Sequence, residues 1–206
     1  MLNDISNRNL KTGVILTVIT ALYLIIHSCI IGRNEFFLLL NTDLGSVADI
    51  FFKLCTNLGD GIVWVLVAIL FYIYHRKRFP LLIAAIIIST LITQLTKNYA
   101  FPAESRPTAA ITDSSLIHTV SGVELHTAYS FPSGHTATAF SIFLIACLLI
   151  KNRWVVPVGF VWALLVAYSR VYLAQHFPLD LGGGMLAAVV TIFLSIGVQK
   201  KFDRKD

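Results

Sequence analysis

The sequence predicts an all-α integral membrane protein, with six transmembrane helices in one bundle and a long extracytoplasmic loop between helices 3 and 4. Two observations support this prediction. Of the 206 residues, 56% are hydrophobic and only 13% are charged, whereas about a quarter of the residues of a soluble domain are charged. The apolar residues also fall in blocks of roughly the 20 residues that a bilayer requires. The length predicts a single domain over residues 1–206.

The apolar blocks give the predicted spans in order. The first covers residues 12–32, and it is too long for the apolar region of a signal peptide, so we expect a retained helix. Residues 34–61 are mixed and suggest an interfacial or re-entrant piece, and the second span then ends at Tyr74. Further spans are expected at residues 81–96, 134–150, 154–173 and 178–199. Ser133 suits the N-cap of the fourth span, and a proline opens the sixth.

Basic residues predict the orientation of these spans. The amino terminus, the two short connections at residues 75–78 and 151–153, and the carboxyl terminus share one side of the membrane. They hold 11 of the 16 Lys and Arg residues. By the positive-inside rule, both termini are cytoplasmic. Because the cations are spread over short loops, the net charge of +5 does not indicate a nucleic-acid partner. No Cys and His spacing typical of a metal site occurs.

Three polar clusters interrupt the apolar blocks, and the predicted topology places all of them on the outer face. In chain order they are Lys97 with Arg106-Pro107, the run Pro132-Ser133-Gly134-His135, and Ser169-Arg170 with His176 and Asp180. Charged groups at the rim of a bilayer are costly unless they have a function. We therefore expect the clusters to meet and form one phosphate-handling site. The long connection at residues 98–131 is expected to shape its entrance.

The residue types in these clusters suit phosphate binding. Arg106 and Arg170 offer planar forks that donate parallel hydrogen bonds, and Lys97 adds a point charge. Ser133 and Gly134 begin a helix, whose free N–H groups hold an anion. This set predicts a phosphate cradle that needs no metal.

Two histidines suit the chemistry of phosphoryl transfer. The spacing lets the Asp180 carboxylate reach one ring nitrogen of His176, which leaves the other nitrogen free to attack phosphorus. His135, at the mouth of another helix, is placed to protonate the leaving oxygen. The sequence thus predicts a nucleophile, a general acid and an orienting carboxylate.

These motifs resemble those of the type 2 phosphatidic acid phosphatase family, in the superfamily that includes vanadium haloperoxidases. Pro132 to His135 match its second motif, and Ser169, Arg170, His176 and Asp180 match its third in full. Lys97 and Arg106-Pro107 match its first motif in residue type. The spacing between them is two residues longer than in the family, and the extra residues fall in the predicted loop.

The resemblance implies a two-step reaction on a phosphorylated lipid through a phosphohistidine at His176, without a metal or other cofactor. The expected phosphate-binding residues are Lys97, Arg106, Ser133, Gly134 and Arg170. By analogy with small bacterial relatives, the favoured substrates are undecaprenyl diphosphate and phosphatidylglycerophosphate. The resemblance implies that the enzyme acts on them at the outer face of the cytoplasmic membrane. Two alternatives stay open, a lipid phosphotransferase with the same residues and a non-enzymatic anion transporter. The oligomeric state is not predicted.

Overall fold

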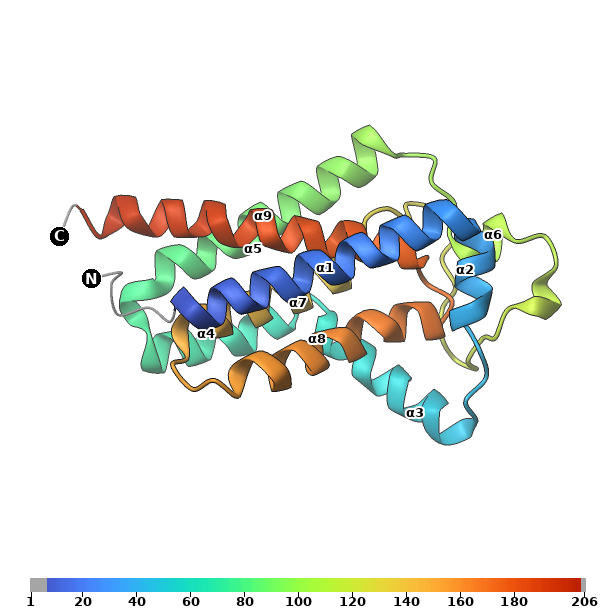
Figure 1. Ribbon diagram of the computed structural model, residues 1–206, viewed down its shortest axis with the longest axis horizontal. Coiled ribbons are helices and arrows are strands. Elements are labelled where there is room, and N and C mark those ends of the chain that lie inside the picture. Colours follow the sequence, from blue (N-terminus) through green and yellow to red (C-terminus); the bar gives the residue numbers. More distant parts are fainter. Residues whose placement is uncertain (1–6, 205–206) are drawn as a thin grey trace.

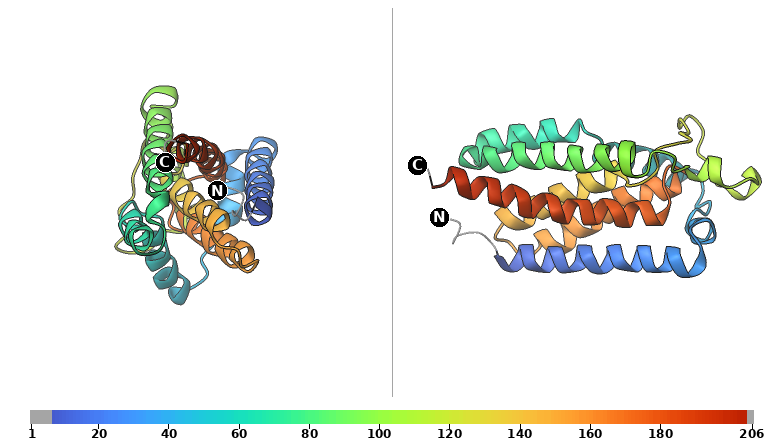
Figure 2. Two further views of the ribbon diagram at one scale, coloured as in Figure 1. Left: turned by 90° about the vertical axis from the view of Figure 1, so that its left-hand side faces the viewer. Right: turned by 90° about the horizontal axis from the view of Figure 1, so that it is seen from above.

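The computed structural model describes residues 7–204, and the regular structure in this range is helical, as the composition predicts (Figure 1). The α-helices are α1 (Asn7–Ile31), α2 (Arg33–Leu40), α3 (Ser46–Cys55), α4 (Val63–Tyr74), α5 (Phe79–Leu95), α6 (Pro107–Ala110), α7 (Gly134–Leu149), α8 (Val155–Tyr172) and α9 (Pro178–Phe202). The long helices run side by side as one bundle (Figure 2).

Four helical segments are long and apolar enough to cross a membrane, and a bent pair makes a fifth. The four are Arg8–Ile31, Arg76–Ala100, Val155–Tyr172 and Pro178–Phe202. The sequence predicted six spans, and the one that these five segments leave out is the fourth, at residues 134–150. The structure has α7 there. This helix has only 16 residues, fewer than a bilayer usually requires. It lies inside the bundle in contact with α1, α5, α8 and α9, so its apolar character serves the protein core.

The bent pair joins Ser46–Gly59 to Val63–Tyr74 at an angle of 55°. The bend lies in the stretch that the sequence indicates is interfacial or re-entrant, and a 3₁₀ turn at Thr56–Gly59 precedes it. Gly59 is required here by close packing. A Cβ atom at this position would lie 2.6 Å from the side chain of Val166 and 3.0 Å from Cβ of His135. The bend therefore packs directly against α7 and α8.

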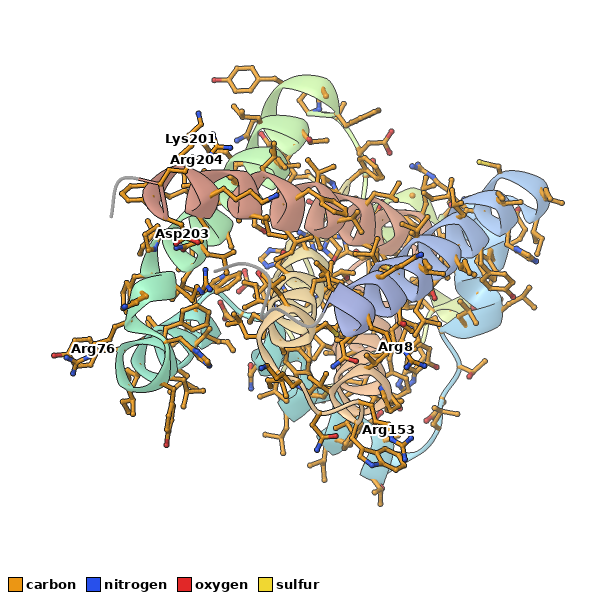
Figure 3. The ribbon with its side chains drawn as sticks, turned by 60° about the vertical axis from the view of Figure 1, so that its left-hand side comes forward. Arg8, Arg76, Arg153, Lys201, Asp203 and Arg204 are labelled. Atoms are coloured by element: carbon orange, nitrogen blue, oxygen red, sulfur yellow. The ribbon has the colours of Figure 1, made fainter. Side chains whose placement is uncertain are left out.

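Basic side chains gather at the end of the bundle that carries both termini. Figure 3, turned so that this end comes forward, labels Arg8, Arg76, Arg153, Lys201 and Arg204 there. The carboxyl ends of α5 and α8 and the amino ends of α7 and α9 lie at the opposite end (Figure 1). The residues at the extreme termini, including Lys205 in the charge count above, lie outside the described residues.

Candidate active site

The centre of the candidate site is a buried histidine–aspartate pair at the start of α9. His176, in the connection from α8, has 2% of its surface exposed, and Asp180 has 3%. His176 Nδ1 lies 3.2 Å from Asp180 Oδ2. Because a carboxylate only accepts hydrogen bonds, Nδ1 carries the ring proton in this pair. The Nε2 lone pair is then free, as the sequence predicts for a nucleophile.

The Asp180 carboxylate is held by two further donors. The backbone N–H of Phe177 donates to Oδ2 at 3.0 Å in a capping arrangement at the start of α9. The buried hydroxyl of Ser130 donates to the same oxygen at 2.5 Å. Sequence reasoning missed Ser130, because its residue type carries no signal and its partner lies 50 positions away. Together these contacts fix the direction from which the carboxylate meets His176.

Three cations lie close enough to the imidazole of His176 to lower its pKa. Burial lowers the pKa of His176 well below its usual value, and the positive charges of Arg106, Arg170 and Lys97 lower it further. The ring is therefore neutral at pH 7. The electrostatic influence of all three cations on one ring shows that the structure brings the first and third motifs together, as predicted.

Gln175 joins the two arginines, and sequence reasoning missed it as well. Its side-chain oxygen accepts a hydrogen bond from Arg106 Nη1 at 3.2 Å and one from Arg170 Nη2 at 3.4 Å. Its amide nitrogen donates to the carbonyl of Glu124 at 2.8 Å. Because Gln175 is 2% exposed and uncharged, it holds both guanidinium groups without cancelling their charge.

Replacing Gln175 with glutamate should weaken phosphate binding, because a carboxylate would neutralise the arginine pair from inside the protein. We expect KM to rise by roughly tenfold or more, on the scale of one charge-assisted hydrogen bond or ion pair. Gln175→Met is the matched variant, since it keeps the length of the side chain and adds no charge. Steady-state kinetics on both variants check this. Equal losses in the two would contradict a role for charge and leave only packing.

Both arginines have donor groups left for a ligand. Arg170 Nη1 donates to Thr56 Oγ1 at 2.5 Å, while its buried Nε has no partner within the described chain. Arg106 Nε donates to the carbonyl of Ala128 at 2.9 Å. A buried guanidinium N–H without an acceptor is costly, so the free Nε of Arg170 is a position where a phosphate oxygen would be stabilised.

The second motif forms the amino terminus of α7, as the sequence predicts. Ser133 is the N-cap, and its hydroxyl oxygen accepts hydrogen bonds from the backbone N–H of Thr136 at 3.4 Å and the Thr136 hydroxyl at 2.9 Å. Its own N–H donates to the Asp180 carbonyl at 3.0 Å, which ties α7 to α9. A Cβ atom on Gly134 would meet nothing within 4 Å. Space for an anion therefore exists at this helix end.

The first motif is split between a helix end and a loop. Lys97 lies in a π-helical turn, Thr96–Ala100, that extends α5. Arg106 begins the short helix α6 as its N-cap, and its own N–H donates to the carbonyl of Thr127 at 2.9 Å. The two extra residues of the motif are accommodated between these points, so both cations still influence His176.

The low pKa of His176 predicts how stability depends on pH. An unfolded histidine binds a proton near pH 6.5, whereas the folded protein resists protonation of His176 until a much lower pH. Unfolding is therefore favoured as the pH falls below about 6.5. We expect the melting temperature in detergent to drop between pH 7.5 and 5, and His176→Gln to reduce that drop. The exposed His126, replaced in the same way, is the control. An unchanged drop in His176→Gln would contradict the prediction.

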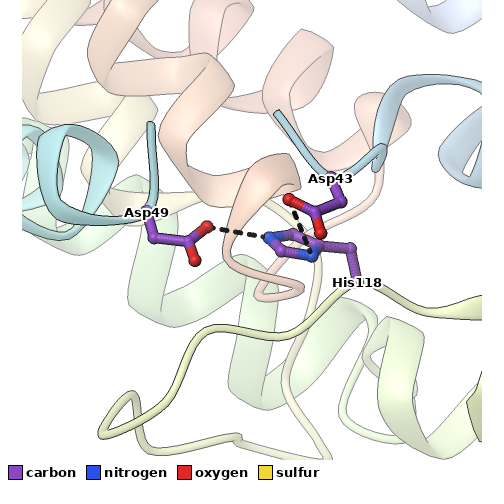
Figure 4. A group of neighbouring side chains, drawn as sticks. All are labelled: Asp43, Asp49 and His118. Atoms are coloured by element: carbon purple, nitrogen blue, oxygen red, sulfur yellow. Dashed lines mark hydrogen bonds and ion pairs between the residues drawn. The ribbon is translucent and has the colours of Figure 1, made fainter. Parts of the chain in front are cut away.

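A second polar cluster lies outside this site. The ring of His118, in the long connection, has Asp49 3.1 Å from Nε2 and Asp43 4.0 Å from Nδ1 (Figure 4). Tyr172 donates its hydroxyl proton to Asp49 at 2.6 Å. Asn41 accepts from the backbone N–H of His118 at 2.8 Å and donates to the carbonyl of Val171 at 2.9 Å. These contacts fasten the long connection to α2, α3 and α8.

The entrance side of the site is fastened by Arg33. It forms an ion pair with Glu104 at 2.5 Å, and its guanidinium lies over the Phe177 ring at 4.9 Å from the centroid. Phe177 directly follows His176. The loop between Lys97 and Arg106 is thereby joined to the connection that carries the histidine.

Fold and site together define an all-helical membrane protein with a cationic site around a buried histidine. The model of the PAP2 superfamily matches residues 80–204, which is more than half of the chain. The chain therefore belongs to the PAP2 superfamily, and it is a lipid phosphatase of that family. This confirms the family that the motifs indicated.

Named relatives agree with this assignment. An undecaprenyl-diphosphatase of Sulfolobus acidocaldarius is 31% identical over 172 residues, which cover 82% of this chain and 80% of the relative. Phosphatidylglycerophosphatase B of Bacillus subtilis is 36% identical over 85 residues, 37% of this chain and 42% of the relative. The crystal structure of Aquifex aeolicus LpxE superimposes with a TM-score of 0.69 at 29% identity, covering 79% of this chain and 93% of that one.

Proposed function

We propose that this protein hydrolyses the phosphomonoester or diphosphate of a membrane lipid through a phosphohistidine on His176. The observation that carries the proposal is the buried His176–Asp180 pair, with Nδ1 3.2 Å from the carboxylate, under the influence of three cations. This arrangement supplies a neutral, oriented nucleophile and the charges that a phosphoryl group requires.

In the first step, the Nε2 lone pair of His176 attacks phosphorus, and the bond from phosphorus to the lipid oxygen breaks. The electron pair of that bond stays on the lipid oxygen, which takes a proton from His135. Lys97, Arg106 and Arg170 hold the equatorial oxygens, together with the end of α7 at Ser133 and Gly134. Asp180 stabilises the positive charge that develops on the His176 ring.

In the second step, water attacks the phosphohistidine. His135 takes a proton from the water as its oxygen bonds to phosphorus, and the bond from phosphorus to Nε2 breaks. The electron pair returns to His176, and inorganic phosphate leaves. His135 is then protonated and ready for the next lipid, so the cycle balances in protons and electrons.

The orientation in the membrane belongs to the same proposal. The chain crosses the bilayer six times as one domain, with α7 as a short crossing and the bent α3–α4 pair as one span. Both termini are cytoplasmic, because the basic side chains at their end of the bundle follow the positive-inside rule. The site then opens at the outer face of a bacterial cytoplasmic membrane. Undecaprenyl diphosphate and phosphatidylglycerophosphate are the favoured substrates, on the activities that the relatives' names state.

Phosphate release from these two lipids in detergent micelles tests the proposal, with a chelator present throughout. We expect release from at least one lipid, and we expect the chelator to leave its rate unchanged. If the chelator abolishes phosphate release, the reaction needs a metal ion, and the proposal that protein side chains alone carry it out is wrong. If release appears only when an acceptor lipid is added, the protein is a phosphotransferase with the same site.

A further inference from the structure

A polar cavity adjoins His135, and the reaction above uses only the part of its wall that Gly134 and His135 form. Its volume is about 200 Å³, many times the 10–15 Å³ or so that one water occupies by this measure. The carboxyl-terminal half of α5 contributes Ser89, Thr90, Thr93 and Gln94 to its wall. Thr138 of α7 and the turn at Gly59 and Gly61 complete it.

The polar side chains around this cavity lack partners. Ser89 is 4% exposed and lines the cavity, yet its hydroxyl makes no hydrogen bond within the part of the chain that the structure describes. The same holds for the side chains of Thr90, Gln94 and Thr138. Thr93 bonds only to carbonyls of its own helix. Leaving the buried hydroxyl of Ser89 unpaired inside a membrane protein is costly. Thr90 and Gln94 are exposed and offer further polar groups along the same wall, so this wall is suited to a polar ligand.

No lysine, arginine, aspartate or glutamate of the described chain lines the cavity. Among the residues that line it, His135 is the single titratable group. The three cations of the site act on both His176 and His135, and they are used by the phosphoryl group that is transferred. Hydroxyl and amide groups without charge match hydroxyl groups on the ligand, because each can donate and accept.

The position of His135 identifies which part of the substrate would enter the cavity. A general acid must lie within hydrogen-bond reach of the oxygen that it protonates, so the leaving group lies on the His135 side of the phosphorus. His135 itself lines this cavity. The atoms attached to the leaving oxygen would therefore extend into it.

We propose that this cavity binds the leaving group, and that it selects phosphomonoesters whose leaving group is an uncharged polyol such as glycerol or a sugar. The inference rests on the proposed function, and it makes that function more specific. Of the two favoured lipids, it selects phosphatidylglycerophosphate, whose leaving group is phosphatidylglycerol, bonded to phosphorus through its head-group glycerol. The leaving group of undecaprenyl diphosphate is undecaprenyl phosphate, which is charged and gains little from these groups.

The test compares kcat/KM for the two lipids in the unmodified protein and in the double variant Thr90→Val and Gln94→Leu. Both side chains are exposed in the structure, so the variant should fold, and its melting temperature in detergent verifies this. We expect roughly a tenfold loss on phosphatidylglycerophosphate, from two lost hydrogen bonds, and less than a twofold change on undecaprenyl diphosphate. Thr12→Val, on an exposed helical position at the far end of the bundle, is the matched control.

Product inhibition gives an independent readout. Phosphatidylglycerol should inhibit the unmodified protein, and the double variant should require roughly ten times more of it. Equal losses on both lipids, no loss on either, or a selective loss on undecaprenyl diphosphate would each overturn the assignment while leaving the phosphatase intact. If the unmodified protein releases phosphate from neither lipid, the proposed function fails, and the leaving-group assignment fails with it.

Discussion

Replacing His176 with alanine should lower kcat by at least about 10⁴-fold, the loss that follows when a nucleophile is removed from a catalytic unit. No other group described near the site is both neutral and oriented by a carboxylate, so water would have to attack phosphorus directly. The arginines and the end of α7 would still bind the phosphate, and KM should therefore change far less than kcat. Phosphate release from micelles of each lipid measures both constants.

The control for this change is His75→Ala. His75 follows α4 at the terminus-bearing end of the bundle, where its side chain is exposed, and its loss should leave kcat unchanged. Brief incubation with lipid labelled in the phosphate gives a second readout. The unmodified protein should retain label, and His176→Ala should retain none. Label on the variant, or release that survives the substitution, would reject His176 as the nucleophile.

Replacing Asp180 with asparagine should lower kcat by about 10³-fold or more, by analogy with the loss when the orienting acid of a triad is changed to its amide. The amide nitrogen of asparagine would donate to His176 Nδ1, so the ring proton would move to Nε2. The nitrogen that should attack phosphorus would then carry a proton and have no lone pair. The shape of the site would be preserved, and kcat should fall more than the affinity for substrate.

Ser130→Ala provides a graded comparison with Asp180→Asn. It removes one donor to the carboxylate but leaves the Phe177 N–H in place, so we expect a loss of roughly tenfold, on the scale of one hydrogen bond to a charged group. Asp113→Asn, on an exposed carboxylate in the long connection, is the matched control. If Ser130→Ala costs as much as Asp180→Asn, the carboxylate depends on Ser130 for its position. If Asp180→Asn is fully active, the ring does not need this carboxylate.

The sequence predicted those features that depend on neighbouring residues. Ser133 caps α7 and Pro178 opens α9 because local chemistry at a helix start decides both. The four-residue spacing of His176 and Asp180 was likewise sufficient to predict their contact. The residue types of the motifs also indicated the family, which the comparisons confirm.

Other features could not be predicted because they depend on packing between distant segments. Gln175 can bond to both arginines only once α8 and the loop at Arg106 are packed together. Ser130 likewise reaches the Asp180 carboxylate only when its loop packs against the start of α9. The bounds of α7 were predicted to within one residue, but the sequence could not distinguish a span from a core helix, because an apolar run inside a bundle looks the same as one in lipid. The sequence indicated an interfacial or re-entrant piece at residues 34–61, but the close packing of its bend at Gly59 against Val166 and His135 joins distant segments and could not be predicted.

The proposed catalytic groups and the polar cavity share His135 but otherwise come from different parts of the chain. His135 lies on α7, Arg170 on α8, Asp180 on α9, and His176 in the connection between α8 and α9. The polar side chains of the cavity wall come mainly from α5, which contributes Ser89, Thr90, Thr93 and Gln94. Mutations on α5 therefore change the leaving-group side while the nucleophile and its carboxylate stay untouched. A lineage with this arrangement can acquire a new lipid substrate without passing through an inactive ancestor.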